Sequence, residues 1–168
     1  EKTMRALILA CLALAALSTE AFAATGEWVD AEHAGLLFKA PAGAEVTSRE
    51  LPEKVHVVVV THGDEVLIMT LYRGKSAPSA KQALGTHADA FERRISKKGN
   101  MRLGKDSVKI LGKKRNTRTI THGMKGAKER TSFTSIRLTK TTFVAAWSAP
   151  SRVRKSISSR ILAGIRFQ

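Results

Sequence analysis

The chain has almost no cysteine. Cys11 is the single cysteine among 168 residues, and it lies inside a short apolar run near the start of the sequence. A chain from which that run has been removed contains no thiol. Disulfides, thiolate metal sites and cysteine nucleophiles are then excluded by composition. The fold must therefore be stabilised by its own hydrophobic core.

Apolar runs long enough to cross a bilayer are also missing. The run Ala6–Leu17 has 12 residues, whereas a membrane-spanning helix needs ~20. It follows Arg5, and Ala21-Phe22-Ala23 provides the small residues of a signal-peptidase site. Residues 1–23 are therefore predicted to be a cleaved secretory signal peptide, with residues 1–3 extraneous to the natural start. A periplasmic or secreted protein without a transmembrane span is expected.

Acidic residues are scarce in the second half of the chain. Residues 92–168 hold 21 Lys and Arg against 3 Asp and Glu, whereas residues 1–91 hold 8 against 11. The formal net charge of +15 therefore comes from the second half. The shortage of acids argues against a paired-carboxylate site there. A field of this sign attracts anions such as nucleic acid, lipopolysaccharide, acidic lipid or an acidic protein surface.

Aromatic residues make up only 5% of the chain. Proteins that bind single-stranded nucleic acid interleave aromatic stacking residues with basic ones. Here Phe133, Phe143 and Trp147 occupy positions that suit the core of a sheet. Nucleic acid is therefore a less favoured partner than an anionic envelope component or an acidic protein.

Catalytic and metal-binding motifs are absent from the sequence. It has no Gly-x-Ser-x-Gly elbow and no phosphate-binding glycine loop. Asp30, Glu32 and His33 are ligand types without a recognised metal-site spacing, and His62 and His122 each lie in a Thr-His-Gly segment typical of a turn. No enzyme activity, cofactor or metal is expected. A hydrolase would require a cleft that joins a His to a carboxylate or a metal.

Hydrophobic periodicity predicts strands, then a helix, in residues 24–100. Ser79 and Gln82 match a capping box for a helix that ends at Gly99 and has one apolar face. The near-continuous hydrophobicity of the later strands implies burial on both faces. Four strands are predicted before the helix, the last two as a hairpin: Trp28-Val29, 36–38, 55–60 and 66–71.

The second half repeats this order. Pro150 is predicted to begin a final helix with Val153, Ile157 and Ile161 on one face. The order strands, helix, strands, helix is typical of an α+β fold in which helices flank an antiparallel, twisted sheet. Residues 24–168 are expected to form one domain. Four strands are predicted ahead of the final helix: 107–111, 116–121, 130–138 and 142–147.

Several segments together resemble the PsbP/DcrB-like superfamily from Trp28 to Phe167. The closing segment has Ala163-Gly164 where that family more usually has Ser. The resemblance implies an α/β/α sandwich in exported or organellar proteins that act as binding or assembly factors and share no catalytic chemistry. It rests, besides the first hairpin, on Phe38-Lys39-Ala40-Pro41-Ala42-Gly43, the capped helix after Ser76-Ala77-Pro78, the Gly112 step, Trp147-Ser148-Ala149-Pro150 and Ile161-Leu162-Ala163-Gly164-Ile165-Arg166-Phe167.

The residues predicted to bind an anion or partner form two groups. One group lies on the predicted long hairpin and its turn, and the other lies on the predicted final helix. A hairpin that projects beyond the sheet would offer a flexible basic arm, whose binding to a polyanion depends strongly on salt. The first group is Lys113, Lys114, Arg115, Arg118, Lys125, Lys128 and Arg130, and the second is Arg152, Arg154 and Lys155, with Arg160 as a further basic residue on the same predicted helix.

The predicted function is an exported, non-catalytic binding or assembly module that docks through this basic surface. Its expected partner is an anionic envelope component, such as lipopolysaccharide or acidic lipid, or an acidic protein. Two alternatives remain open. The charge could serve only solubility, while a sheet edge or groove binds a partner peptide. The basic surface could also bind nucleic acid.

Overall fold

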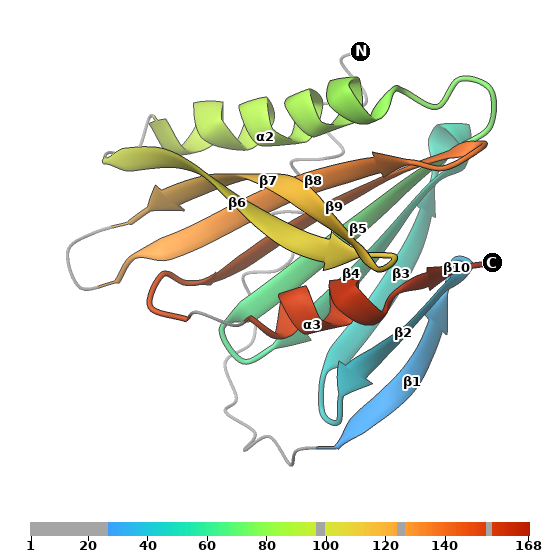
Figure 1. Ribbon diagram of the computed structural model, residues 1–168, viewed down its shortest axis with the longest axis horizontal. Coiled ribbons are helices and arrows are strands. Elements are labelled where there is room, and N and C mark those ends of the chain that lie inside the picture. Colours follow the sequence, from blue (N-terminus) through green and yellow to red (C-terminus); the bar gives the residue numbers. More distant parts are fainter. Residues whose placement is uncertain (1–26, 97–99, 124–126, 154–155) are drawn as a thin grey trace.

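The computed structural model describes residues 27–96, 100–123, 127–153 and 156–168 (Figure 1). The predicted signal peptide lies outside these residues. Within them the chain is mostly antiparallel sheet with two α-helices, so the α+β fold class is confirmed. The elements are β1 (Trp28–His33), β2 (Leu36–Pro41), β3 (Glu45–Leu51), the 3-10 helix η1 (Pro52–Lys54), β4 (Val55–His62), β5 (Glu65–Arg73), α2 (Ala80–Ser96), β6 (Met101–Ile110), β7 (Lys113–His122), β8 (Glu129–Arg137), β9 (Thr141–Pro150), α3 (Ile157–Gly164) and β10 (Arg166–Phe167).

Two sheets are present in the described residues. The larger has seven strands in the order β3-β4-β5-β9-β8-β7-β6, and the smaller has three in the order β1-β2-β10. The β5–β9 ladder joins the two halves of the chain, with Leu67 opposite Trp147 and Leu71 opposite Phe143. Strands from the first half of the sequence therefore lie at one end of the large sheet, and strands from the second half lie at the other.

Side chains on the two faces of the large sheet pack against different layers. Leu67 and Phe143 face a main core that also contains Phe38 of β2 and Ile161 of α3. On the opposite face, Phe91 of α2 packs against buried residues of β7 and β8. Helix α2 therefore covers one face, whereas α3 and the small sheet cover the other (Figure 1).

Both helices begin at a serine cap. The predicted capping box is confirmed, because Ser79 Oγ accepts from Gln82 N at 3.2 Å and Gln82 Oε1 accepts from Ser79 N at 3.0 Å. The predicted start of the last helix at Pro150 is wrong, since β9 continues to Pro150. Helix α3 begins only at Ile157, after Ser156 accepts a hydrogen bond from the Ser159 amide.

The 55–60 and 66–71 hairpin is confirmed as β4 and β5. Strand β3 was not predicted, because it is an edge strand whose polar side chains are mostly exposed. The first strand is longer than the predicted Trp28-Val29. Strand β1 runs to His33, since Ala34 and Gly35 adopt φ values of 51° and 69° and turn the chain in two residues.

The basic strands are only partly enclosed by the sheet. Strand β7 pairs with β6 along its whole length but with β8 only from Arg118 to His122, so Lys113 to Thr117 pair with β6 alone. Strand β6 begins at Met101 and not at Ser107, and its end buries Val108 and Ile110 in the main core. Within the described part of the chain, no helix is long and apolar enough to span a membrane.

Candidate anion-binding surface and groove

The β6–β7 hairpin places cations side by side on one face of the sheet. Lys105 lies opposite Arg118, and Lys109 lies opposite Lys114. Side chains alternate between the two faces along each strand, so all four lie on the same face. Helix α2 packs on this face and contacts Arg118. Like charges directly opposite one another destabilise a sheet. The Lys109–Lys114 pair is therefore not explained by folding stability.

Four lysines and one leucine define what we call the hairpin surface: Lys105, Lys109, Leu111, Lys113 and Lys114. All five are exposed. Among the ion pairs formed by described residues, none involves these four ammonium groups. Their charge is therefore available to an external anion. The sequence reasoning missed Lys105, Lys109 and Leu111, although Lys105 and Lys109 share the two-residue alternation of a strand.

Leu111 occupies an unusual position at the tip of this hairpin. Its φ is 51° and that of Gly112 is 74°, so both turn residues lie in the left-handed region. Asn, Asp and Gly are favoured in such turns, whereas a leucine there is strained by ~1–3 kcal/mol. The side chain is also 39% exposed. The turn thus keeps a strained, exposed apolar residue between Lys109 and Lys113.

Arg118 has a different environment from these lysines. Its Nη1 donates to Asp89 Oδ1 at 2.6 Å, and its Nη2 donates to Glu92, both on α2. Hydrogen bonding to Asp89 is the main reason that the pKa of Arg118 is raised. The guanidinium therefore links β7 to α2, and its charge is already neutralised by two carboxylates. Asp89 and Glu92 are three residues apart, a spacing that places both on one side of a helix.

The remaining predicted anion-binding residues are dispersed. Arg115 is half-buried on the same face as Val108, and its Nε has no hydrogen-bond partner in the described part of the chain. Arg130 donates from Nη2 to the Val153 carbonyl at 2.9 Å. Lys128 and Arg152 are exposed, but Arg152 precedes α3 and is not on the helix. Three further predicted residues lie outside the described residues: Lys125, Arg154 and Lys155.

His122 contacts one hydroxyl group directly and a second one through it, and a carboxylate lies nearby. Its Nε2 lies 3.0 Å from Thr131 Oγ1, which lies 2.7 Å from Ser148 Oγ. Glu129 is 4.0 Å from the same Nε2, whereas a catalytic triad uses the two ring nitrogens for its two contacts. Thr131 is also buried, with 2% of its surface exposed. This arrangement therefore lacks the geometry of a nucleophile and its base.

His87, a residue of α2, is buried against the large sheet. Nε2 of His87 and the hydroxyl of Tyr72 lie 2.7 Å apart. Burial lowers the pKa of His87 to about 4 and raises the pKa of Tyr72 to about 12. Both side chains are therefore neutral at physiological pH, and their hydrogen bond fixes α2 to β5.

The acidic residues and histidine of β1 do not converge. Asp30 and Glu32 lie on one face of the strand, whereas His33 lies on the other, where its Nδ1 is 3.3 Å from Ser48 Oγ. Across the described residues, no group of three or more His, Cys, Asp or Glu side chains could hold a metal ion.

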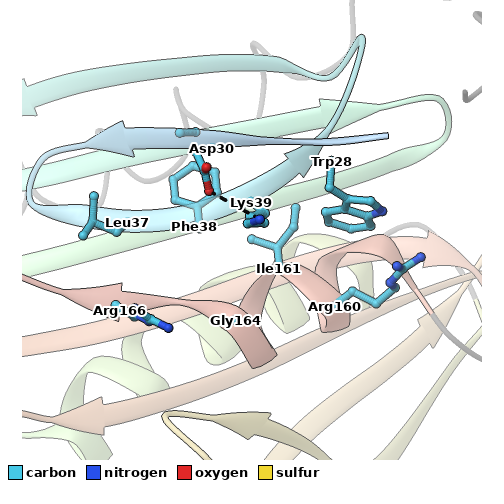
Figure 2. Close-up of a pocket in the computed structure, with 10 residues that line it drawn as sticks. Trp28, Asp30, Leu37, Phe38, Lys39, Arg160, Ile161, Gly164 and Arg166 are labelled. Carbon is cyan, nitrogen blue, oxygen red and sulfur yellow. Dashed lines mark ion pairs between the residues drawn. The ribbon is translucent and has the colours of Figure 1, made fainter. Parts of the chain in front are cut away.

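An open groove of about 640 Å³ lies between the β1–β2 hairpin and α3. Figure 2 shows Trp28 and Arg160 at one end of it and Leu37 and Arg166 at the other. Phe38 and Ile161 also line the groove. Sequence reasoning missed this site because its residues come from both ends of the described chain and only the fold brings them together.

The groove carries more positive than negative charge. Lys39, Arg160 and Arg166 line it together with one carboxylate, that of Asp30. The carboxylate pairs with Lys39, since Oδ1 lies 3.8 Å from Nζ. The Arg160 guanidinium lies 4.3 Å above the centre of the Trp28 ring, within the range of a cation–π contact. The two arginines have no ion pair with any described carboxylate.

Comparisons with known proteins bear only weakly on the fold. No protein-family model matches the chain, and no curated protein matches it. A crystal structure from Bacteroides thetaiotaomicron VPI-5482 is similar at a TM-score of 0.48 and 12% sequence identity. The match covers 80% of this chain and 45% of that one, so this chain spans less than half the length of that protein.

Proposed function

We propose that the protein is a non-catalytic binding module that docks on an anionic lipid bilayer through the hairpin surface. The observation that carries this proposal is Leu111, an exposed and strained apolar side chain at the tip of a basic hairpin. Acidic headgroups would pair with the lysines, while Leu111 would enter the boundary between headgroups and acyl chains. Nucleic acid offers negative charge without acyl chains, whereas a bilayer of acidic lipid or lipopolysaccharide offers both environments side by side.

The expected energies favour this mode of binding. Each Lys or Arg held close to an acidic membrane contributes ~1 kcal/mol, and this contribution declines as salt screens the surface. Lys109 and Lys114 share one face of the hairpin, whereas Lys113 lies on the other face beside the turn. An approach by the hairpin tip brings all three ammonium groups to the headgroups. Arg118 is not included, because Asp89 and Glu92 already neutralise it.

A vesicle assay tests the proposal directly. The protein should co-sediment with vesicles that contain phosphatidylglycerol, should not do so with pure phosphatidylcholine vesicles, and should be released as salt is raised from 50 to 500 mM. Binding to both kinds of vesicle alike, or no binding to either, would contradict lipid docking. Capture by an acidic protein without vesicle binding would favour the acidic-partner alternative.

Replacing Leu111 with Asn separates docking from folding. Asn tolerates positive φ better than leucine, so the free energy of unfolding in urea should stay the same or rise. Binding to phosphatidylglycerol vesicles should nevertheless fall severalfold, because the apolar tip is lost. If L111N binds as tightly as the wild type, the tip does not enter the membrane.

We propose that the protein is exported, on the basis of the Ala6–Leu17 apolar run and the small residues before Ala24. A mature protein recovered from the periplasm or medium should begin at Ala24, which N-terminal sequencing would establish. Recovery of the uncleaved chain from the cytoplasm would contradict export.

We also propose that the fold is of the PsbP/DcrB-like type. Three features support this: the order of the elements, the position of α2 on one face of the large sheet, and the position of α3 on the other. A crystal structure of the protein, compared with members of that superfamily, would test the assignment. A different strand order in the shared sheet would refute it.

A further inference from the structure

We propose that the groove between the β1–β2 hairpin and α3 is a second binding site, which holds a single-chain organic anion: an acyl or alkyl chain that ends in a carboxylate or phosphate. This site is separate from the hairpin surface and does not depend on it. None of the residues that line the groove belongs to β6 or β7. The site would bind one molecule of an amphiphile and not a membrane surface.

The apolar lining of the groove fits a hydrocarbon chain. Trp28 and Leu37 are half-buried at its two ends, and Phe38 and Ile161 line it between them. Its volume of about 640 Å³ is within the ~300–1,000 Å³ of small-molecule sites. A chain laid along the groove would therefore cover Trp28 and Leu37, which are partly exposed to water, whereas Phe38 and Ile161 are already buried, with 3% and 1% of their surface exposed.

The free cations favour an acidic head at the Arg160 end. The guanidinium of Arg160 is held over the Trp28 ring, so its orientation is set before a ligand arrives. A stacked guanidinium can still donate from its edge, and its fork of N–H groups suits a carboxylate or a phosphate. Arg166 lies at the opposite end of the groove (Figure 2), where it would contribute only a weaker, longer-range attraction.

An extended peptide fits the groove less well. Such a ligand usually adds a strand to an open sheet edge and uses its backbone hydrogen bonds. Strand β2, which forms a wall of the groove, is paired with β1 along its whole length on one edge. On the other edge β10 pairs with Leu36 and Leu37, and α3 packs against β2 beyond that point. The groove thus offers side-chain cations and apolar surface, which are what a short anionic amphiphile requires.

Isothermal titration of the protein with four probes tests this site. Octanoate and octyl phosphate, below their micelle concentrations, should bind with a stoichiometry of one, whereas 1-octanol and acetate should bind at least tenfold more weakly. Arg160→Ala should weaken octanoate binding at least tenfold, and Arg166→Ala should weaken it less than threefold. Arg49→Ala, at an exposed arginine of β3, should leave it unchanged.

Several results would overturn the proposal: no saturable heat with octanoate, equal affinity for 1-octanol, or no effect of either groove variant. If Arg160→Ala fails to fold, Arg160→Lys keeps the charge but loses the planar stack, and its affinity should fall severalfold; an unchanged affinity would count against the site. Replacing Lys109, Lys113 and Lys114 should leave octanoate binding intact, which separates this site from vesicle docking.

Discussion

The protein in which Lys109, Lys113 and Lys114 are all replaced by Gln is expected to bind phosphatidylglycerol vesicles about 100-fold more weakly than the wild type. Three ammonium groups at ~1 kcal/mol each give ~3 kcal/mol, which corresponds to two powers of ten in the partition constant. The loss should be largest at low salt and should shrink at high salt. Co-sedimentation over a series of lipid concentrations measures the partition constant of each protein at low and at high salt.

Three cations elsewhere provide a matched control. Arg49, Lys75 and Lys81 are exposed on β3, after β5 and on α2, and their replacement by Gln removes the same formal charge. That variant should retain most of the vesicle binding. Similar losses in the two triple variants would show that only the net charge matters, and that the hairpin surface is not the docking site.

Acidification from pH 6.5 to pH 4 is expected to reduce the free energy of unfolding by roughly 3 kcal/mol through His87 alone. Burial lowers the pKa of His87 from 6.5 to about 4. Above pH 6.5 His87 is unprotonated in both the folded and the unfolded chain, so the full free energy of unfolding is present. Between pH 6.5 and 4 only the unfolded chain is protonated, and stability falls. Below pH 4 both states are protonated, and His87 causes no further loss.

Urea unfolding of the His87→Gln variant across this pH range isolates the contribution of His87. Gln can still hydrogen bond to the Tyr72 hydroxyl and does not titrate. The difference in unfolding free energy between the wild type and H87Q should therefore change by roughly 3 kcal/mol from pH 6.5 to 4. His122, whose pKa burial also lowers, is common to both proteins and cancels. If the unfolding free energies of the wild type and H87Q change in the same way with pH, then His87 is not buried as a neutral side chain.

The predictable parts of the fold are those in which local signals agree with the tertiary structure. The β4–β5 hairpin was predicted because its strands are apolar, and α2 because Ser79 and Gln82 form its capping box. Strand β3 could not be predicted, because an exposed edge strand with polar side chains shows no alternation of apolar residues. The start of α3 was placed too early, since the cap at Ser156 determines it and the apolar spacing does not.

For the hairpin surface, only the positive charge could be predicted from the sequence. Sequence reasoning placed the cations in the second half, but it could not show that Arg118 is paired with α2 while Lys109 and Lys114 face each other unpaired. Those relations depend on strand register and on the packing of a helix from another part of the chain. The groove was beyond prediction, because Trp28 and Arg160 are 132 positions apart and meet only when α3 packs beside β1 and β2.

The strand order of the large sheet converts the uneven charge of the sequence into an electric dipole. Strands β3, β4 and β5 come from the acid-rich half of the chain and occupy one end, whereas β6 and β7 come from the basic half and occupy the other. In the field of a negatively charged surface, such a molecule experiences a torque that turns its β6 edge forward. Productive orientation would therefore begin before contact, and the association rate should fall with salt more steeply than the dissociation rate rises.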